Sequence, residues 1–203
     1  MSSKAIATKP FRRLFSGGRA EVNYLTAMRQ VLGWQGEIYP RIAAANRILR
    51  FCVVNVSLLG LVYGMSAFYL SGAVLAEGSA QVQVNPIMIL MAGMSVAFLM
   101  HGGAALFFWV FCRGIGGNPL FMPIYLNLGI AALALVPLAP ALAALQAGLR
   151  GGGLLVYTFV FTVYAGGVLY VAMRKAAGLA HWKMALAAAA AVIYIGCFLY
   201  LWT

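Results

Sequence analysis

Five long apolar runs between Phe51 and Trp202 constrain this chain more than any other feature. A helix needs about 20 apolar residues to cross roughly 30 Å of hydrocarbon. The chain is also 64% hydrophobic, with a mean hydropathy of +0.94, which lies outside the range of globular domains. We therefore predict an all-α polytopic transmembrane helix bundle with five spans, at residues 51–76, 86–112, 120–147, 154–173 and 184–202.

The third of these runs contains Pro123, Pro137 and Pro140. Proline lacks the backbone N–H and clashes with the preceding helical turn, so this span is expected to be broken or kinked. A broken helix persists in a membrane only where neighbouring groups satisfy the freed carbonyls, which places this span inside the bundle. Broken helices also form the binding sites of many transporters.

The basic residues are distributed unevenly along the chain. Nine of the 14 Lys and Arg residues precede residue 51, and with five crossings only Arg150 falls on the opposite side from the rest. The positive-inside rule then predicts a basic cytoplasmic N-terminal segment at 1–50, a transmembrane domain at 51–203 and a C-terminus on the far side. Within the N-terminal segment, four residues are expected to meet anionic lipid headgroups: Lys9, Arg12, Arg13 and Arg19.

Residues 21–35 have the spacing of an amphipathic helix, because apolar residues recur there at i, i+3 and i+4. The stripe consists of Val22, Leu25, Met28, Leu32 and Trp34. Two interpretations remain open. The helix lies on the membrane surface, or it packs in the cytoplasm against loops of the same protein.

His101 is the one ionisable residue expected in the core of the bilayer. It belongs to a row of small residues on one helix face, with Gly93 and Ala97 preceding it at intervals of four. Small residues let helices approach closely, and a histidine can then hydrogen-bond across the interface. We expect a neutral packing histidine bonded to an acceptor on a neighbouring helix, such as Ser57, Ser66, Thr158 or Tyr164. The alternative is a proton- or ligand-responsive site.

Three further residues complete the set of candidate intramembrane packing and polar positions. Gly60 and Gly64 form a pair of small residues four apart in the first span, and Asn127 is the polar group nearest the proline-broken region. We interpret the glycine pair as a contact between helices of one chain, with a dimer contact as the alternative.

The sequence offers little for catalysis. Its only acids are Glu21, Glu37 and Glu77, there is no aspartate, and no Asp, Glu, Lys or Arg lies within a span. No zinc-protease, nucleophile-elbow, phosphate-loop or dinucleotide motif occurs in a usable context. His101 and His181 are expected at different depths, which disfavours a haem shared between them. We therefore predict a non-enzymatic protein with no cofactor, no metal and no nucleic-acid partner.

Two stretches of the second half resemble the Yip family of Ypt/Rab-interacting membrane proteins. In FCRGIGGNPLFMPIYLNLGIAALALVPLAPALAAL, a helix ends in a Gly-Gly turn and a proline-bearing helix follows. In MRKAAGLAHWKMALAAAAAVI, Gly178, Leu179, Lys183 and Ala185 occupy the places of the family's return loop. The resemblance covers residues 86–203 and implies five spans and a membrane organiser. Eukaryotic members carry an acidic, Tyr-rich N-terminal segment, whereas this one is basic and suits a bacterial member.

These observations favour an accessory or scaffold subunit of a larger assembly, acting through helix–helix and lipid contacts, with other integral membrane proteins as partners. The expected location is a bacterial inner membrane. A small transporter or channel component, with the broken third helix lining a path, is the first alternative. A haem- or quinone-associated membrane subunit is the second.

Overall fold

The computed structural model describes residues 22–76 and 85–202, and no strand occurs in these ranges. The predicted all-α class is therefore confirmed for the described part of the chain. Its elements are α1 (Tyr24–Leu32), α2 (Ile38–Ala44), α3 (Ile48–Ala76), α4 (Pro86–Gly114), α5 (Phe121–Ala131), the 3₁₀ helix η2 (Ala132–Leu135), α6 (Leu138–Gln146), α7 (Gly152–Ala177) and α8 (His181–Trp202).

Three helices of the described ranges are long and apolar enough to cross a membrane: Ile48–Leu70 within α3, Pro86–Gly114 and Gly152–Ala177. The bent pair Phe121–Leu135 and Leu138–Gln146 makes a fourth if it is counted as one span. These helices coincide with the first four predicted runs, and α8 covers the fifth. The chain thus has the helices of an integral membrane protein.

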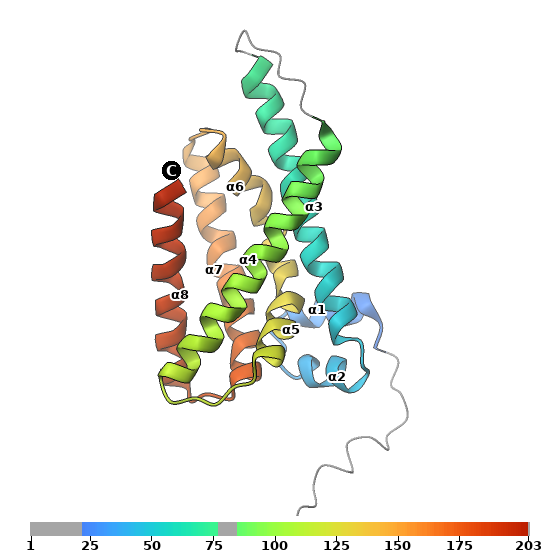
Figure 1. Cartoon of the computed structure of the whole chain (residues 1–203), viewed down its shortest axis with the longest axis vertical. Helices are drawn as coiled ribbons and strands as arrows, with labels where there is room; N and C mark the ends of the chain where they lie inside the picture. The colour runs from blue at the N-terminus through green and yellow to red at the C-terminus, as the bar shows by residue number, and fades with distance from the viewer. Residues whose placement is uncertain (1–21, 77–84, 203) are drawn as a thin grey trace, which may run out of the picture.

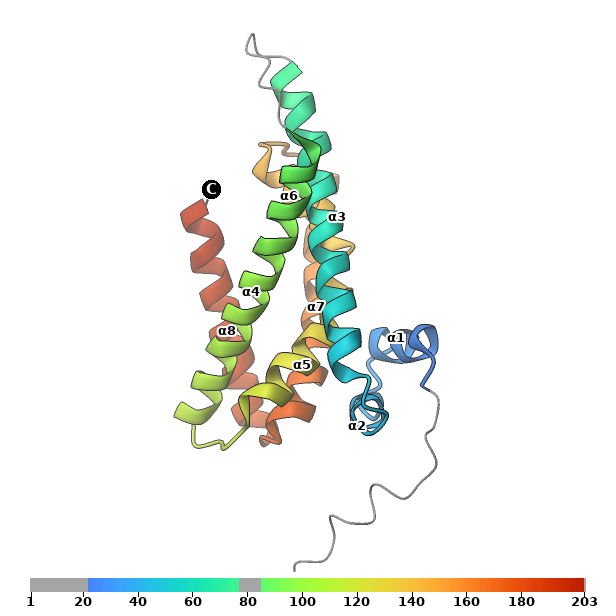
Figure 2. The same ribbon diagram turned by 45° about the vertical axis from the view of Figure 1, so that its right-hand side comes forward.

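The long helices form an elongated bundle, which Figures 1 and 2 show from two sides. The helices α3 and α4 cross along its length, and α8 packs on α4 and α7. One end carries α1, α2 and the turn between α4 and α5; the other carries the turn between α6 and α7 and the end of α8. We call the first of these the α1–α2 end.

The charges of the bundle are gathered at the α1–α2 end. The described ranges contain nine Lys and Arg residues, and only Arg150 belongs to the turn at the opposite end. This placement agrees with the asymmetry seen in the sequence. The predicted lipid-facing residues Lys9, Arg12, Arg13 and Arg19 lie outside the described residues, as do Glu21 and Glu77.

The third apolar run is divided, as its prolines predict, and its two parts are bent by 74°. Pro137 directly precedes α6, whereas Pro123 and Pro140 lie in the first turns of α5 and α6, where a backbone N–H has no partner within the helix. Only Pro137 therefore stands at the break itself.

Neighbouring helices satisfy carbonyls on both sides of this break. The Asn55 side chain of α3 donates to the Ile130 carbonyl over 2.7 Å, and the Tyr157 hydroxyl of α7 donates to the Pro137 carbonyl over 2.8 Å. These two bonds tie the segments on either side of the break to α3 and α7. The break therefore lies where α3 and α7 support it.

The four predicted small packing residues meet at one crossing of α3 and α4. A Cβ added at Gly60 would lie 2.7 Å from the Met94 Cα and 3.0 Å from the Ala97 Cβ, and one at Gly93 would lie 2.8 Å from both the Gly60 carbonyl and the Gly64 Cα. Backbones this close leave no space for a side chain. The small residues thus make a contact within the chain, as interpreted from the sequence.

Candidate functional site

A fully buried asparagine joins the N-terminal helices to the bundle. Asn55 of α3 accepts a hydrogen bond of 2.6 Å from the Tyr24 hydroxyl, and its Nδ2 lies 3.2 Å from the Met28 sulfur. The same Nδ2 donates to Ile130, so this one side chain links α1, α3 and the broken helix. Sequence analysis missed Asn55, although an amide within an apolar run is a signal that can be found.

The helix α1 packs on its own protein, but its buried side chains join those of α3, α5, η2 and α7 and not those of loops. Its buried residues are Ala27, Met28 and Val31, whereas Leu25 is 75% exposed. The predicted apolar stripe is therefore wrong at Leu25. The bond between Tyr24 and Asn55 sets the rotation of the helix, so the docked face is not the one with the largest aliphatic side chains.

Three further contacts hold the N-terminal segment against α7. The Tyr164 hydroxyl donates to the Leu32 carbonyl over 2.9 Å. The Trp34 ring lies so close to Gly167 that an added Cβ there would be 2.6 Å from it. Lys175 forms an ion pair with Glu37, and this hydrogen-bonded ammonium group lowers the pKa of Glu37 below its ordinary value.

His101 lies on the buried face of α4 and contacts α3 and α5. Its Nε2 is 3.9 Å from the Cys52 sulfur, and its ring centroid is 4.4 Å from that of Tyr125. A Cβ added at Gly129 would collide with the Cys52 sulfur and lie 3.2 Å from the His101 Cε1. Gly129 therefore permits this contact of three helices, and Cys52 is a packing residue there.

His101 meets a group on a neighbouring helix, as predicted, but that group is the Cys52 sulfur and none of the four hydroxyls named as examples. The hydroxyls of Ser66 and Thr158 donate instead to carbonyls four residues earlier in their own helices, and that of Tyr164 donates to Leu32. Such back-bonding is the usual alternative for a hydroxyl within a helix. The remaining candidate, Ser57, is half-buried on α3, and the side chain that faces the histidine from that helix is Cys52.

The metal-ligating side chains of the described ranges are otherwise dispersed. Within residues 22–76 and 85–202, no three His, Cys, Asp or Glu side chains gather where they could hold a metal ion. His181 is exposed at the start of α8, whereas His101 is buried on α4. The arrangement around His101 is thus a contact between a thiol, an imidazole and an aromatic ring.

No protein-family model matches the chain, and no curated protein and no solved structure matches it. The Yip-family resemblance accordingly remains a prediction. The interpretation of the site depends on its geometry.

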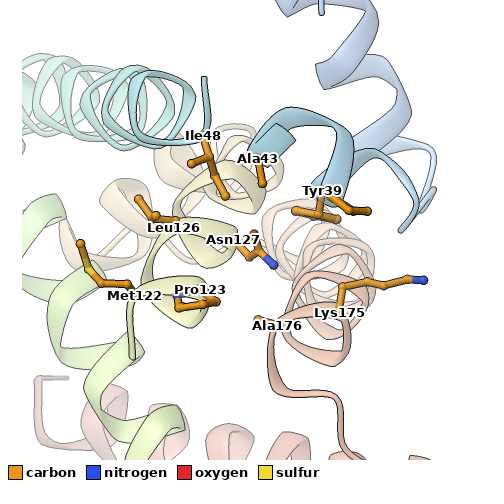
Figure 3. A pocket seen from close by; sticks show the side chains of 10 residues that line it. Tyr39, Ala43, Ile48, Met122, Pro123, Leu126, Asn127, Lys175 and Ala176 are labelled. Carbon is orange, nitrogen blue, oxygen red and sulfur yellow. The ribbon is translucent and has the colours of Figure 1, made fainter. Parts of the chain in front are cut away.

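A cavity of about 360 Å³ lies at the α1–α2 end, between α2, the start of α3, α5 and the end of α7. Its polar lining residues are Tyr39, Asn127 and Lys175. Tyr39 is 2% exposed, and its buried hydroxyl has no hydrogen-bond partner among the described residues. Burial also raises the pKa of Tyr39, so the phenol is neutral. Asn127, a polar position singled out in the sequence, points into the space between Tyr39 and Ala176 (Figure 3).

Proposed function

We propose that this protein is a non-enzymatic integral membrane scaffold or accessory subunit, which acts through helix–helix and lipid contacts within a larger membrane assembly. The observation that carries the proposal is the outward apolar surface of α4 and α7. Only 11% of each of these spans is buried within the chain. The exposed side chains include Met88, Met91, Leu99, Leu106 and Val110 of α4, and Leu155, Val156, Phe159 and Val163 of α7.

The interior polar contacts also favour this function. Asn55, Tyr157 and Tyr164 each bond a neighbouring segment of the same chain, and His101 contacts two other helices. These groups hold the bundle together and leave the outer faces of α4 and α7 apolar. An apolar face in a membrane meets either lipid chains or another protein.

We further propose five crossings, a cytoplasmic N-terminus and a C-terminus on the other side of a bacterial inner membrane. The gathering of basic residues at the α1–α2 end supports this orientation. The course of α8 toward the opposite end supports a fifth crossing. Membership of the Yip family is proposed on the sequence pattern of residues 86–203.

The test is co-purification of full-length variants in mild detergent, followed by quantitative mass spectrometry. Leu99→Trp places a bulky ring on the outer face of α4. Leu25→Trp is its matched control, because both leucines are 75% exposed and Leu25 lies outside the predicted spans. We expect Leu99→Trp to reduce recovery of integral membrane partners severalfold, with the thermal midpoint of the protein unchanged. If Leu99→Trp, Leu25→Trp and Phe159→Ala on α7 all recover the same amount of integral membrane partners, the result would argue against a scaffold.

The 74° break between η2 and α6 favours a second candidate, a small transporter or channel component. Its observable is solute or ion flux into liposomes that contain the purified chain alone. Tyr157→Phe removes the hydrogen bond to the Pro137 carbonyl beside the break. A change of flux in this variant would favour the transporter or channel over the scaffold.

A further inference from the structure

The helix α1 lies beside the spans, farther from the end of the bundle than α2, as Figures 1 and 2 both show. It is bonded to α3 at Asn55, five residues past Arg50, an interval of about 8 Å along a helix. It is bonded to α7 at Tyr164, ten residues before Arg174, an interval of about 15 Å. Arginines near the ends of spans extend to the headgroup region. When α3 and α7 cross a membrane, α1 therefore lies within the adjoining leaflet.

The side of α1 that faces away from the bundle carries polar side chains around a hollow. Ala27, Met28 and Val31 are buried against the bundle. The hollow has a volume of about 400 Å³, and its lining residues are Thr26, Arg29, Gln30, Gly33 and Gln35. All of them except Gln30 are exposed. Hydrocarbon offers no hydrogen bonds to a guanidinium or an amide, so at this depth these side chains need polar groups from another molecule.

The charge of the hollow is positive and has no counter-charge. Glu37 is the one acid in the described ranges, and it pairs with Lys175, so Arg29 has no acidic partner within them. The segment ahead of α1 is a poor occupant, because residues 1–21 contain five Lys and Arg residues and a single Glu. A guanidinium binds phosphate through two parallel hydrogen bonds. The hollow therefore fits an anion that comes from outside the chain.

Apolar side chains adjoin the hollow. Leu25 is 75% exposed and precedes Arg29 by four residues, so the two are neighbours on the surface of the helix. Trp34 is 51% exposed, although part of its ring packs on Gly167. Tryptophan is enriched at membrane interfaces, and leucines of interfacial helices lie among the acyl chains. The outer side of α1 thus combines a cationic centre with apolar edges, as an acidic phospholipid requires.

We propose that this side of α1 binds an acidic phospholipid of the leaflet in which the helix lies. The lipid phosphate accepts hydrogen bonds from the Arg29 guanidinium and from the side-chain amides of Gln30 and Gln35. The acyl chains lie against Leu25 and Trp34. None of the described residues that line the hollow is acidic, so the choline of a zwitterionic lipid has no counter-charge there. The site rests on the proposed crossing of the membrane by α3 and α7 and does not depend on a protein partner.

The first test measures binding to the delipidated full-length protein in detergent by native mass spectrometry. The ligands are phosphatidylglycerol, phosphatidylcholine of the same acyl chains, and glycerol phosphate. We expect phosphatidylglycerol to bind about fivefold more tightly than phosphatidylcholine, the effect of one basic residue near an anionic headgroup. Glycerol phosphate should bind far more weakly, because it lacks the chains that meet Leu25 and Trp34. Equal affinity for the two lipids, or for phosphatidylglycerol and glycerol phosphate, would overturn the proposal.

Point variants assign the preference to the hollow. Arg29→Gln should remove the fivefold preference and leave the melting temperature of the lipid-free protein unchanged, because Arg29 is exposed and has no ion pair within the described ranges. Arg29→Lys keeps the charge and should retain most of the preference. Arg150→Gln is the matched control, because Arg150 is exposed in the turn at the opposite end. Equal losses in Arg29→Gln and Arg150→Gln would mean that net charge alone selects the lipid, and would overturn the site.

The second test locates α1 relative to the membrane in liposomes. A spin label at Leu25→Cys, in a background without native cysteines, should be relaxed more by oxygen than by a water-soluble nickel complex. Val163→Cys, at a position 58% exposed on α7, reports on the crossing itself. Nickel access at Leu25→Cys alone would overturn the lipid site in favour of a soluble acidic partner and leave the crossing intact. Nickel access at both positions would contradict the crossing, and the site with it.

Discussion

Gly129 is the described glycine at which an added carbon would come nearest to another atom. Cys52 of α3 and His101 of α4 both lie against Gly129 of α5, so the three helices are in contact at this residue. Gly129→Ala should destabilise the protein by about 1–3 kcal/mol, the usual cost of overpacking. Cys52→Ala removes the sulfur that the new methyl group would strike. The double variant should therefore melt later than Gly129→Ala alone.

The matched control for this pair is Gly166→Ala, which meets no other atom within 4 Å on α7. It should leave the melting temperature unchanged or raise it, since alanine is favoured over glycine in helices by up to about 1 kcal/mol. Thermal melting in detergent measures all four variants. Simple additivity of Gly129→Ala and Cys52→Ala would show that the two residues do not interact in this way.

The ion pair between Glu37 and Lys175 should make docking of α2 dependent on pH. The pKa of Glu37 is lowered from its ordinary value of 4.5, so the pair contributes stability above that pH. The contribution is lost as the pH falls below 4.5 through the lowered pKa. Because both side chains are exposed, the effect should be small and reduced by salt.

Glu37→Gln is the variant that measures this contribution. It should melt slightly earlier than the unaltered chain at pH 7 in low salt, and the difference should shrink as the pH falls below 4.5. A difference that stays constant as the pH falls would show that Glu37 acts through something other than its charge.

At the scale of elements, α1 depends on Asn55 for its attachment to the bundle. Asn55→Ala leaves the Tyr24 hydroxyl and the Ile130 carbonyl without their partner, at a cost of about 1–3 kcal/mol. We expect α1 to detach before the spans unfold, so limited trypsin digestion should cleave faster after Arg29. Asn118→Ala, in the exposed turn between α4 and α5, should leave that cleavage rate unchanged. An unchanged rate in Asn55→Ala would mean that Tyr164 and Trp34 hold α1 without it.

The elements also show what the sequence could and could not predict. The break in the third run follows from the chemistry of Pro137, and the row Gly93, Ala97, His101 follows from helical spacing. The docked face of α1 does not, because a bond from Tyr24 to a residue 31 positions away decides its rotation. The spacing of apolar residues within a helix cannot indicate a hydrogen-bond partner that lies so far away in the sequence.

Of the residues of the candidate site, too, some could be predicted from the sequence and others could not. Asn127 and His101 stand out as polar residues in apolar runs, and both are buried. Tyr39 does not stand out, since nothing in its sequence neighbourhood indicates a buried hydroxyl without a partner. The cavity depends on how α2 lies against α5 and α7, and that placement is a property of the packed chain.

For the whole molecule, the central claim is a bundle of five crossings with the α1–α2 end in the cytoplasm. The most direct measurement is cysteine labelling of intact cells with an impermeant maleimide. The background replaces Cys52, Cys112 and Cys197 by alanine, and single cysteines are then introduced as Asn118→Cys or Thr203→Cys. We predict that Thr203→Cys is labelled in intact cells and Asn118→Cys only after the cells are permeabilised. Protection of Thr203→Cys in intact cells, with labelling after permeabilisation, would contradict the five-span account.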